Sequence, residues 1–235
     1  MIRKQTTLSV ALLACVAIIA YATHLALIAP TDALQGNVFR ILYYHVPSSM
    51  ISMALPYVNL VASVLYLYWR TRDQRKARSA DAVAVASAEV MLVYATICLL
   101  TGMLWGRVAW GIWWTWDWRL TSMLILWLLY VSYMVVRRLA SVGQTPTLGA
   151  VISVFAAIDV PIVYMSIRWF RTQHPAPIFG GDAESGMDRS MYPAFLWNVA
   201  AWSLWAVLMM CIRYRVERER QAADDRLAAE LIEAT

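Results

Sequence analysis

Tryptophan is concentrated in one short stretch of this sequence, WGIWWTWDWRLT at residues 110–121, where five tryptophans fall within nine positions. Tryptophan is wide, flat and amphipathic, and its indole carries one N–H donor. Burial alone would be served as well by leucine or isoleucine. The run therefore favours either an aromatic belt at a membrane interface or a platform for a flat ligand.

A belt spreads tryptophan over all the ends of the membrane spans, whereas six of the twelve tryptophans here lie between residues 105 and 118. This clustering favours the ligand platform, although an amphipathic helix lying in the interface would carry the same residues. The platform candidates are Trp105, Trp110, Trp113, Trp114, Trp116 and Trp118, together with Asp117.

The spacing within the cluster is compatible with two conformations. A helix would place on one face Trp110, Trp113, Trp114 and Asp117. An extended chain would instead align Trp114, Trp116 and Trp118. Gly106 and Gly111 argue against one uninterrupted helix. Asp117 directly precedes an apolar segment, where an aspartate caps the free N–H groups of a helix start, so we expect it to set the angle at which the tryptophan loop leaves that helix.

Two of the three histidines flank the tryptophan stretch along the chain: His45 in YYHVPSS and His174 in WFRTQHPAP. Neutral imidazole is a good iron ligand, and two imidazoles on opposite sides of a plane complete the coordination of an iron already held by four porphyrin nitrogens. Two histidines beside an aromatic platform therefore predict a haem site with His45 and His174 as axial ligands. His24 is expected to be a buried, hydrogen-bonded histidine rather than a third ligand.

Haem carries two propionates at one edge, and arginine binds carboxylates well. The arginines near the tryptophan cluster and the second histidine are Arg107, Arg119 and Arg171. Each has an alternative role as a helix-end arginine that extends its charge to the membrane surface, and the sequence leaves both roles open.

The composition is that of a membrane protein. Of the 235 residues, 61% are hydrophobic and 15% are charged, whereas soluble domains have roughly 45–50% apolar and about 25% charged residues. The cysteines, Cys15, Cys98 and Cys211, lie far apart in apolar stretches, with no CxxC and no CxxCH. These features argue against a disulfide framework, a thiol oxidoreductase and a c-type cytochrome. The basic residues that give the net charge of +5 are placed by membrane topology and do not form a nucleic-acid patch.

Six segments are long and apolar enough to cross a bilayer as helices, which takes about 20 residues each. They cover residues 8–29, 44–69, 82–104, 120–136, 148–167 and 194–212. The first is long for a signal-peptide core and ends in APTD rather than at a small-residue cleavage site, so we interpret it as an uncleaved span. We therefore predict an all-α integral membrane protein, with a six-helix domain at 1–212 and a charged, helical cytoplasmic tail at 213–235.

The distribution of Lys and Arg predicts the orientation of these spans. Fourteen of the 20 basic residues lie in the N-terminus, in 70–78, in 137–138 and in the tail. By the positive-inside rule both termini are cytoplasmic, and the connections near 30–43, 105–119 and 168–193 face the opposite side. This criterion, which ignores tryptophan and histidine, places the tryptophan loop, His45 and His174 on the same outer face.

The residues quoted above match a known pattern. WGIWWTWDWRLTS closely resembles the WWD signature, WGxWWxWDxRLTS, of proteins that handle haem in cytochrome c maturation. YYHVP resembles the first histidine motif of that group, and the W-x-x-T-x-H of WFRTQHP resembles the second. With its length, six spans and one histidine motif on either side of the WWD loop, the chain resembles the haem exporter protein C (CcmC) family of the multi-component maturation system (system I).

The resemblance implies a function. Such proteins hold haem, here haem b as a transiently bound substrate, at the periplasmic face of the bacterial cytoplasmic (inner) membrane, with the two motif histidines as axial ligands. They present it to a membrane-anchored haem chaperone of the CcmE type. An ATP-binding-cassette assembly of CcmA- and CcmB-type subunits, with a small CcmD-type membrane subunit, then releases the loaded chaperone. We expect a haem-delivery scaffold rather than a bond-making enzyme. Trp118 departs from the signature, because it occupies a variable and often small position.

Two other functions stay open. A b-type cytochrome would hold haem between spans through histidines at membrane depth, where only His24 is expected to lie. A haem permease would need a polar path through the bilayer, and intramembrane carboxylates are candidates for such a role. Two exist here, Glu89 and Asp159. Asp159 could alternatively satisfy backbone groups freed near Pro161, and Glu89 has no evident partner among its neighbours in sequence.

Overall fold

A computed structural model describes residues 2–139, 145–175 and 187–233 of the chain. Apart from an isolated bridge between Asp32 and Gly36, the regular structure of these residues is helical. The α-helices are α1 (Ile2–Ile28), α2 (Leu42–Trp69), α3 (Gln74–Trp110), α4 (Trp118–Leu139), α5 (Thr145–Trp169) and α6 (Tyr192–Glu233), with 3-10 turns η1 (Asn37–Ile41) and η2 (Arg189–Met191). Six helices are long and apolar enough to cross a membrane, which confirms the predicted all-α membrane fold.

The helices coincide with the predicted spans but most of them are longer. α3 begins at Gln74 rather than at 82 and ends at Trp110 rather than at 104. α6 continues without interruption from the sixth span through the charged tail to Glu233. Hydropathy marks only the part of a helix that suits the bilayer, and turns with charged residues outside it carry no hydropathy signal.

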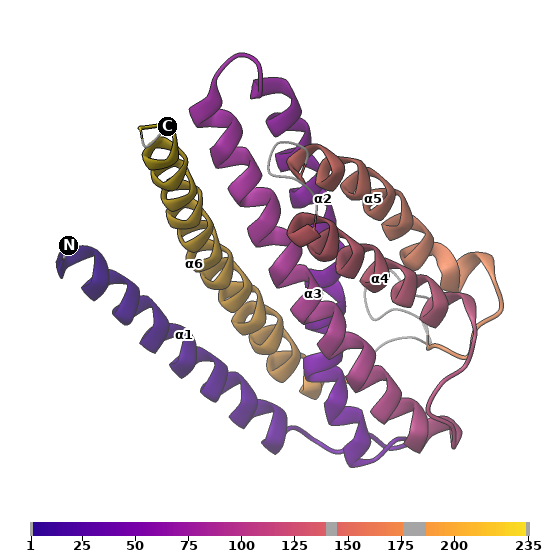
Figure 1. Cartoon of the computed structure of the whole chain (residues 1–235). Coiled ribbons are helices and arrows are strands. Elements are labelled where there is room, and N and C mark those ends of the chain that lie inside the picture. The colour runs from indigo at the N-terminus through magenta and orange to yellow at the C-terminus, as the bar shows by residue number, and fades with distance from the viewer. Residues whose placement is uncertain (1, 140–144, 176–186, 234–235) are drawn as a thin grey trace.

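The connections that carry the tryptophans and His174 gather at one end of the bundle. In Figure 1 both termini and the turn between α2 and α3 lie toward the opposite end, as an even number of alternating spans requires. Residues 176–186 of the third predicted outer connection lie outside the described residues. The assignment of the tryptophan end to the periplasmic side stays a prediction from the positive-inside rule.

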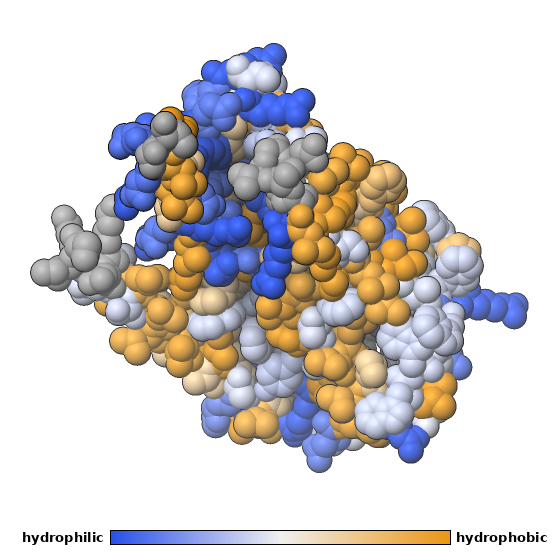
Figure 2. Space-filling view, in the orientation of Figure 1, coloured by the Kyte–Doolittle hydropathy of each residue, from blue (hydrophilic) through white to orange (hydrophobic). Residues whose placement is uncertain are grey.

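The surface carries an apolar zone between two hydrophilic ends. Figure 2 shows hydrophobic side chains across the middle of this face, with hydrophilic ones toward its upper and lower edges. α1 packs against α6, where Tyr21 meets Trp197 edge-to-face at 5.0 Å and the Asn198 side chain donates to the Ala22 carbonyl at 2.9 Å. The rest of α1 is largely exposed, as expected for a helix in contact with lipid.

Small side chains allow α2 and α3 to pack closely at the centre of the bundle, which is the usual solution for helices in a membrane. The buried small residues of α3 include Ala80, Ala82, Ala84, Ala86, Ser87, Ala88 and Ala95. Asn59 of α2 donates to the Ala84 carbonyl at 2.7 Å and to Ser87 at 3.3 Å. Larger residues of α3 and α4, among them Tyr94, Leu126 and Tyr130, fill the remaining core.

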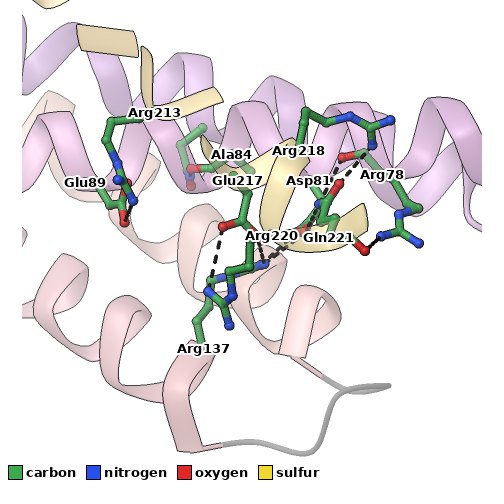
Figure 3. Close-up of polar contacts among 11 residues, drawn as sticks. Arg78, Asp81, Ala84, Glu89, Arg137, Arg213, Glu217, Arg218, Arg220 and Gln221 are labelled. Atoms are coloured by element: carbon green, nitrogen blue, oxygen red, sulfur yellow. Dashed lines mark hydrogen bonds and ion pairs between the residues drawn. The ribbon is translucent and has the colours of Figure 1, made fainter. Parts of the chain in front are cut away.

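At the end opposite the tryptophans, ion pairs join α3, α4 and α6 (Figure 3). Arg137 of α4 binds both carboxylate oxygens of Asp81, at 2.7 and 2.9 Å, and lies 4.0 Å from Glu217 of α6. Arg213 of α6 pairs with Glu89 of α3. Glu89, which had no partner in its sequence neighbourhood, is therefore matched by a residue 124 positions later in the chain.

Candidate functional site

A cavity of about 650 Å³ opens at the tryptophan end, between α2, α3, α4 and α5. Its walls are mostly apolar, and its polar lining includes His45 from α2, Arg119 from α4 and His174 from the segment after α5. Both predicted axial ligands thus line one cavity, although 129 residues separate them in sequence.

His45 lies in the first turn of α2 rather than in a loop. Its Nδ1 is 3.0 Å from the hydroxyl of Thr101 on α3, and that hydroxyl donates its own proton to the Ile97 carbonyl at 2.6 Å. The Thr101 oxygen therefore accepts, and the Nδ1–H of His45 donates. This tautomer leaves the lone pair of Nε2 free for a ligand. Gly102 makes room for the ring, because a Cβ there would stand 3.1 Å from His45 Cε1.

His174 presents the same tautomer by a different contact. Its Nδ1 is 2.8 Å from the Pro175 carbonyl, which can only accept, so Nδ1 carries the proton and Nε2 is bare. Burial, together with the nearby Arg119 and His45, lowers the pKa of His174 to about 3. The imidazole is therefore neutral at physiological pH, which is the form that binds metals.

The two imidazoles lie close together in the cavity lining, with their ring centroids 6.3 Å apart and their planes inclined by 34°. In metal sites the nitrogen that does not bind the metal usually donates to an oxygen, which fixes the tautomer and the ring orientation. Here Thr101 and the Pro175 carbonyl already fill that role. In both residues the hydrogen bond at Nδ1 leaves Nε2 as the nitrogen that carries the lone pair.

The tryptophans divide into two groups. Trp105, Trp110 and Trp114 line the cavity. Trp105 donates its indole N–H to Gln35 at 2.7 Å and meets Trp110 edge-to-face at 4.9 Å. The indole N–H of Trp114 is buried and has no hydrogen-bond partner among the described residues.

Trp113, Trp116 and Trp118 are exposed and lie outside the cavity lining. Trp118 stacks on Phe170 with ring centroids 4.3 Å apart. Some tryptophans of this stretch therefore line the cavity and the others are exposed at the surface. The predicted platform of all six is not one continuous surface.

Two glycines shape this stretch in different ways. Gly111 ends α3 in a left-handed conformation, with φ of 77°, and residues 111–117 are not helical. Gly106, which was expected to interrupt a helix, instead lies inside α3, where its missing side chain lets the Trp110 ring pack at 3.2 Å from the position a Cβ would take. The single helical face predicted for the stretch is not observed, because α3 ends at Gly111. Beyond it, Trp114 and Trp116 meet edge-to-face with ring centroids 5.8 Å apart.

The three arginines also differ in placement. Arg119 lines the cavity, and one of its guanidinium nitrogens donates to the Val163 carbonyl of α5, which leaves further donors. Arg107 is exposed and donates to the carbonyl of Gly111, at the end of α3. Arg171 is exposed and, like Arg107, lies outside the cavity lining. Of the three arginines, Arg119 is the one that lines the cavity.

Asp117 caps α4 as expected, accepting from the Leu120 N–H at 2.9 Å. The other predicted polar residues lie away from the cavity lining. His24, predicted to be buried and hydrogen-bonded, is instead exposed on α1, a helix whose main packing partner within the described part of the chain is α6. Asp159 is buried in α5, and its Oδ2 has no hydrogen-bond partner among the described residues.

Several residues of the site were not singled out from the sequence. Gln35, Thr101 and Gly102 are unremarkable types in a loop and a helix, and they gain meaning only because folding brings them beside Trp105 and His45. Thr172 differs, because it is the threonine of the W-x-x-T-x-H pattern and its position in that pattern was visible.

Comparison with known proteins connects this site to a family. The family model described as "Heme exporter protein C" matches residues 2–228. The chain belongs to the heme exporter protein C family. A member from Bradyrhizobium diazoefficiens is 34% identical over 213 residues, covering 88% of this chain and 78% of the relative. One from Escherichia coli is 32% identical over 198 residues, covering 82% and 73%.

A more distant relative is a protein of Marchantia polymorpha, named as a cytochrome c biosynthesis ccmC-like mitochondrial protein. It is 30% identical over 186 residues, covering 77% of this chain and 75% of the relative. These matches confirm the resemblance drawn from the WWD and histidine motifs. They also make the protein a multi-pass membrane member of a haem-handling family.

Proposed function

We propose that the protein binds haem b as a transient substrate at the periplasmic end of the bundle, in a bacterial cytoplasmic membrane, with Nε2 of His45 and His174 as axial ligands. The single observation that carries this proposal is the close pair of imidazoles in one cavity lining, 6.3 Å apart between centroids, each with Nδ1 already hydrogen-bonded. The names of the relatives, which refer to heme export and cytochrome c biosynthesis, support the same ligand.

The spacing suits a metal held between two imidazoles. A metal–imidazole bond is about 2 Å long and the ring centre lies roughly 1 Å behind the nitrogen, so two rings sharing one metal have centroids roughly 6 Å apart. Two protein ligands suffice for iron already bound by four porphyrin nitrogens. The cavity of about 650 Å³ is within the range of roughly 300–1,000 Å³ of ligand pockets.

The remaining side chains suit the other parts of a porphyrin. Trp105, Trp110 and Trp114 offer flat apolar faces. Arg119 offers guanidinium donors to a propionate, and the buried, unpartnered N–H of Trp114 lies in the same lining. The residues present therefore fit haem, and Arg107 and Arg171 are left with roles outside the cavity.

We further propose that the protein is a delivery scaffold rather than an enzyme. It presents the haem to a membrane-anchored periplasmic chaperone of the CcmE type, which bonds to it covalently. ATP-binding-cassette subunits of the CcmA and CcmB types, with a CcmD-type subunit, complete the complex. A substrate that must leave is better held by two exchangeable ligands than by a covalent bond, and the cavity opens at the end where a periplasmic partner can reach it.

The test is the visible spectrum of the detergent-purified protein from haem-replete cells, with His45→Ala, His174→Ala and His24→Ala compared. We expect six-coordinate haem in the parent protein, loss of that signature in the first two variants, and no change in the third, because His24 is exposed on α1 away from the cavity. A haem spectrum that is unchanged in both His45→Ala and His174→Ala would refute the assignment of these histidines as axial ligands. Haem retained indefinitely in the presence of a CcmE-type chaperone would refute delivery.

A further inference from the structure

Asp117 contacts the segment that carries His174 as well as the start of α4. Its Oδ1 caps α4 by accepting from the Leu120 N–H at 2.9 Å. Its Oδ2 accepts from the hydroxyl of Thr172 at 2.7 Å. One carboxylate of the WWD loop therefore holds both the helix that follows it and a segment 55 residues later in the chain.

The hydroxyl of Thr172 continues this connection to the histidine. While its proton goes to Asp117, its oxygen accepts from the backbone N–H of His174 at 3.1 Å. The order Asp117–Thr172–His174 is thus a chain of two hydrogen bonds through a single oxygen atom. The stack of Trp118 on Phe170 holds the same two segments together beside it.

The two histidines are held very differently. His45 lies within α2, its ring contacts the position of Gly102 and its Nδ1–H is bound to α3. His174 lies beyond the end of α5, and among the described residues its side chain bonds only the neighbouring Pro175 carbonyl. A ligand on a continuous helix moves only with that helix, whereas a ligand on a short non-helical segment can leave when its backbone anchor is released.

We infer that His174 is the exchangeable axial ligand and that Thr172, anchored by Asp117, is the positioning residue that keeps it on the iron. This inference rests on the proposed function and adds to it which ligand yields during hand-over. Asp117 then acts through Thr172 and does not itself contact the haem. The aspartate of the tryptophan signature has a structural purpose in this arrangement: it ties the platform to the second ligand.

Carbon monoxide reports the exchange directly, because it binds ferrous six-coordinate haem only after one axial ligand has left. Thr172→Val keeps the shape of the side chain and removes both hydrogen bonds, whereas Thr172→Ser retains the hydroxyl. Changes in such supporting contacts typically alter metal binding about 10- to 100-fold. We expect carbon monoxide to bind roughly tenfold faster in Thr172→Val, with a five-coordinate component in the spectrum, and at the parent rate in Thr172→Ser.

Thr121→Val is the matched control. It makes the same substitution in the first turns of α4, where the Thr121 hydroxyl has no hydrogen-bond partner among the described residues, so the rate is expected to stay at the parent value. Thr172→Ala, which also lacks the hydroxyl, should reproduce Thr172→Val and replaces it if the valine variant does not fold. His174→Ala gives the limiting rate for a missing second ligand.

The outcomes separate this inference from the proposed function. If His174→Ala removes the six-coordinate spectrum but both hydroxyl-deleting variants bind carbon monoxide at the parent rate, the Thr172 anchor is refuted and haem ligation stands. If His45→Ala raises the rate and His174→Ala does not, the exchangeable ligand has been assigned to the wrong histidine. If neither histidine variant changes the spectrum, the proposed function fails and this inference fails with it.

Discussion

Gly102 offers a sharp test of whether the position of the His45 ring determines haem binding. A Cβ at this site would stand 3.1 Å from His45 Cε1 and 3.7 Å from Nδ1. Carbon atoms in good contact are about 3.5–4.0 Å apart, so in Gly102→Ala the ring must move by roughly 0.4 Å. A misplacement of 1 Å costs catalytic sites on the order of 100-fold. If the cost in free energy grows in proportion to the displacement, a shift of roughly 0.4 Å weakens haem binding roughly sixfold.

The same substitution is expected to leave the fold as stable as before or slightly more so. Gly102 lies inside α3, and replacing glycine by alanine in a helix interior stabilises it by roughly 0.5–1 kcal/mol. Haem affinity, measured by titration in detergent, should therefore fall while the melting temperature of the haem-free protein does not. These opposite signs separate a local effect on the ligand from general damage.

Gly149→Ala provides a matched clash elsewhere. A Cβ there would stand 3.0 Å from the ring of Tyr133, which is buried in the core cluster. We expect this variant to melt at a lower temperature and to bind haem with unchanged affinity per folded molecule.

Unchanged haem affinity and spectrum in Gly102→Ala would refute the assignment of His45 as a ligand held by close packing.

Three further predictions test other contacts. Thr101→Val removes the acceptor that fixes the tautomer of the first axial ligand, so haem affinity should fall roughly tenfold in a titration, with Thr101→Ser close to the parent. Arg119→Gln removes a charged donor in the cavity and should weaken haem binding by about 1.5–3 kcal/mol, whereas Arg107→Gln, outside the cavity, should change it little. Arg137→Ala removes the arginine that binds both oxygens of the buried Asp81 carboxylate, which among the described residues keeps only the uncharged Gln221 side chain at 3.2 Å. This variant should destabilise the fold by about 3–5 kcal/mol in chemical unfolding, against less than about 1 kcal/mol for the exposed Arg138→Ala.

The sequence predicts the fold well because its signal is periodic and strong. Each span has enough consecutive apolar residues to mark its place, and the alternation of spans then brings the tryptophan and histidine connections to one end. The ends of α3 were missed, because its outer turns carry charged or tryptophan-rich sequence that hydropathy does not register. Gly106 was misinterpreted for another reason: its packing against Trp110 could not be known before both were placed.

Some residues of the candidate site could likewise be chosen from the sequence, and others only from the folded structure. His45 and His174 could be chosen from residue type and motif, and the structure places both in one cavity. The choice of Arg119 over Arg107 and Arg171 could not be made from sequence, because all three lie near helix ends and only the packing of α4 against α5 decides which guanidinium points inward. Gln35 was missed entirely because a glutamine in a loop becomes informative only when an indole N–H is found beside it.

The two carboxylates expected at membrane depth bear on the permease alternative in different ways. The charge of Glu89 is compensated by Arg213, so removing either partner would leave an uncompensated charge, and a structural role accounts for the pair. Asp159 has one unpartnered oxygen among the described residues and stays the better candidate for a polar path. Neither residue lines the cavity. A porphyrin moving through the interior of the bundle from the opposite end would meet the buried cluster that includes Tyr94, Leu126 and Tyr130, whereas loading from the tryptophan end leaves this core intact. Loading of haem at the tryptophan end therefore disrupts the buried core less than translocation through the bundle would. Normal haem loading in an Asp159→Asn variant would support the first route over the second.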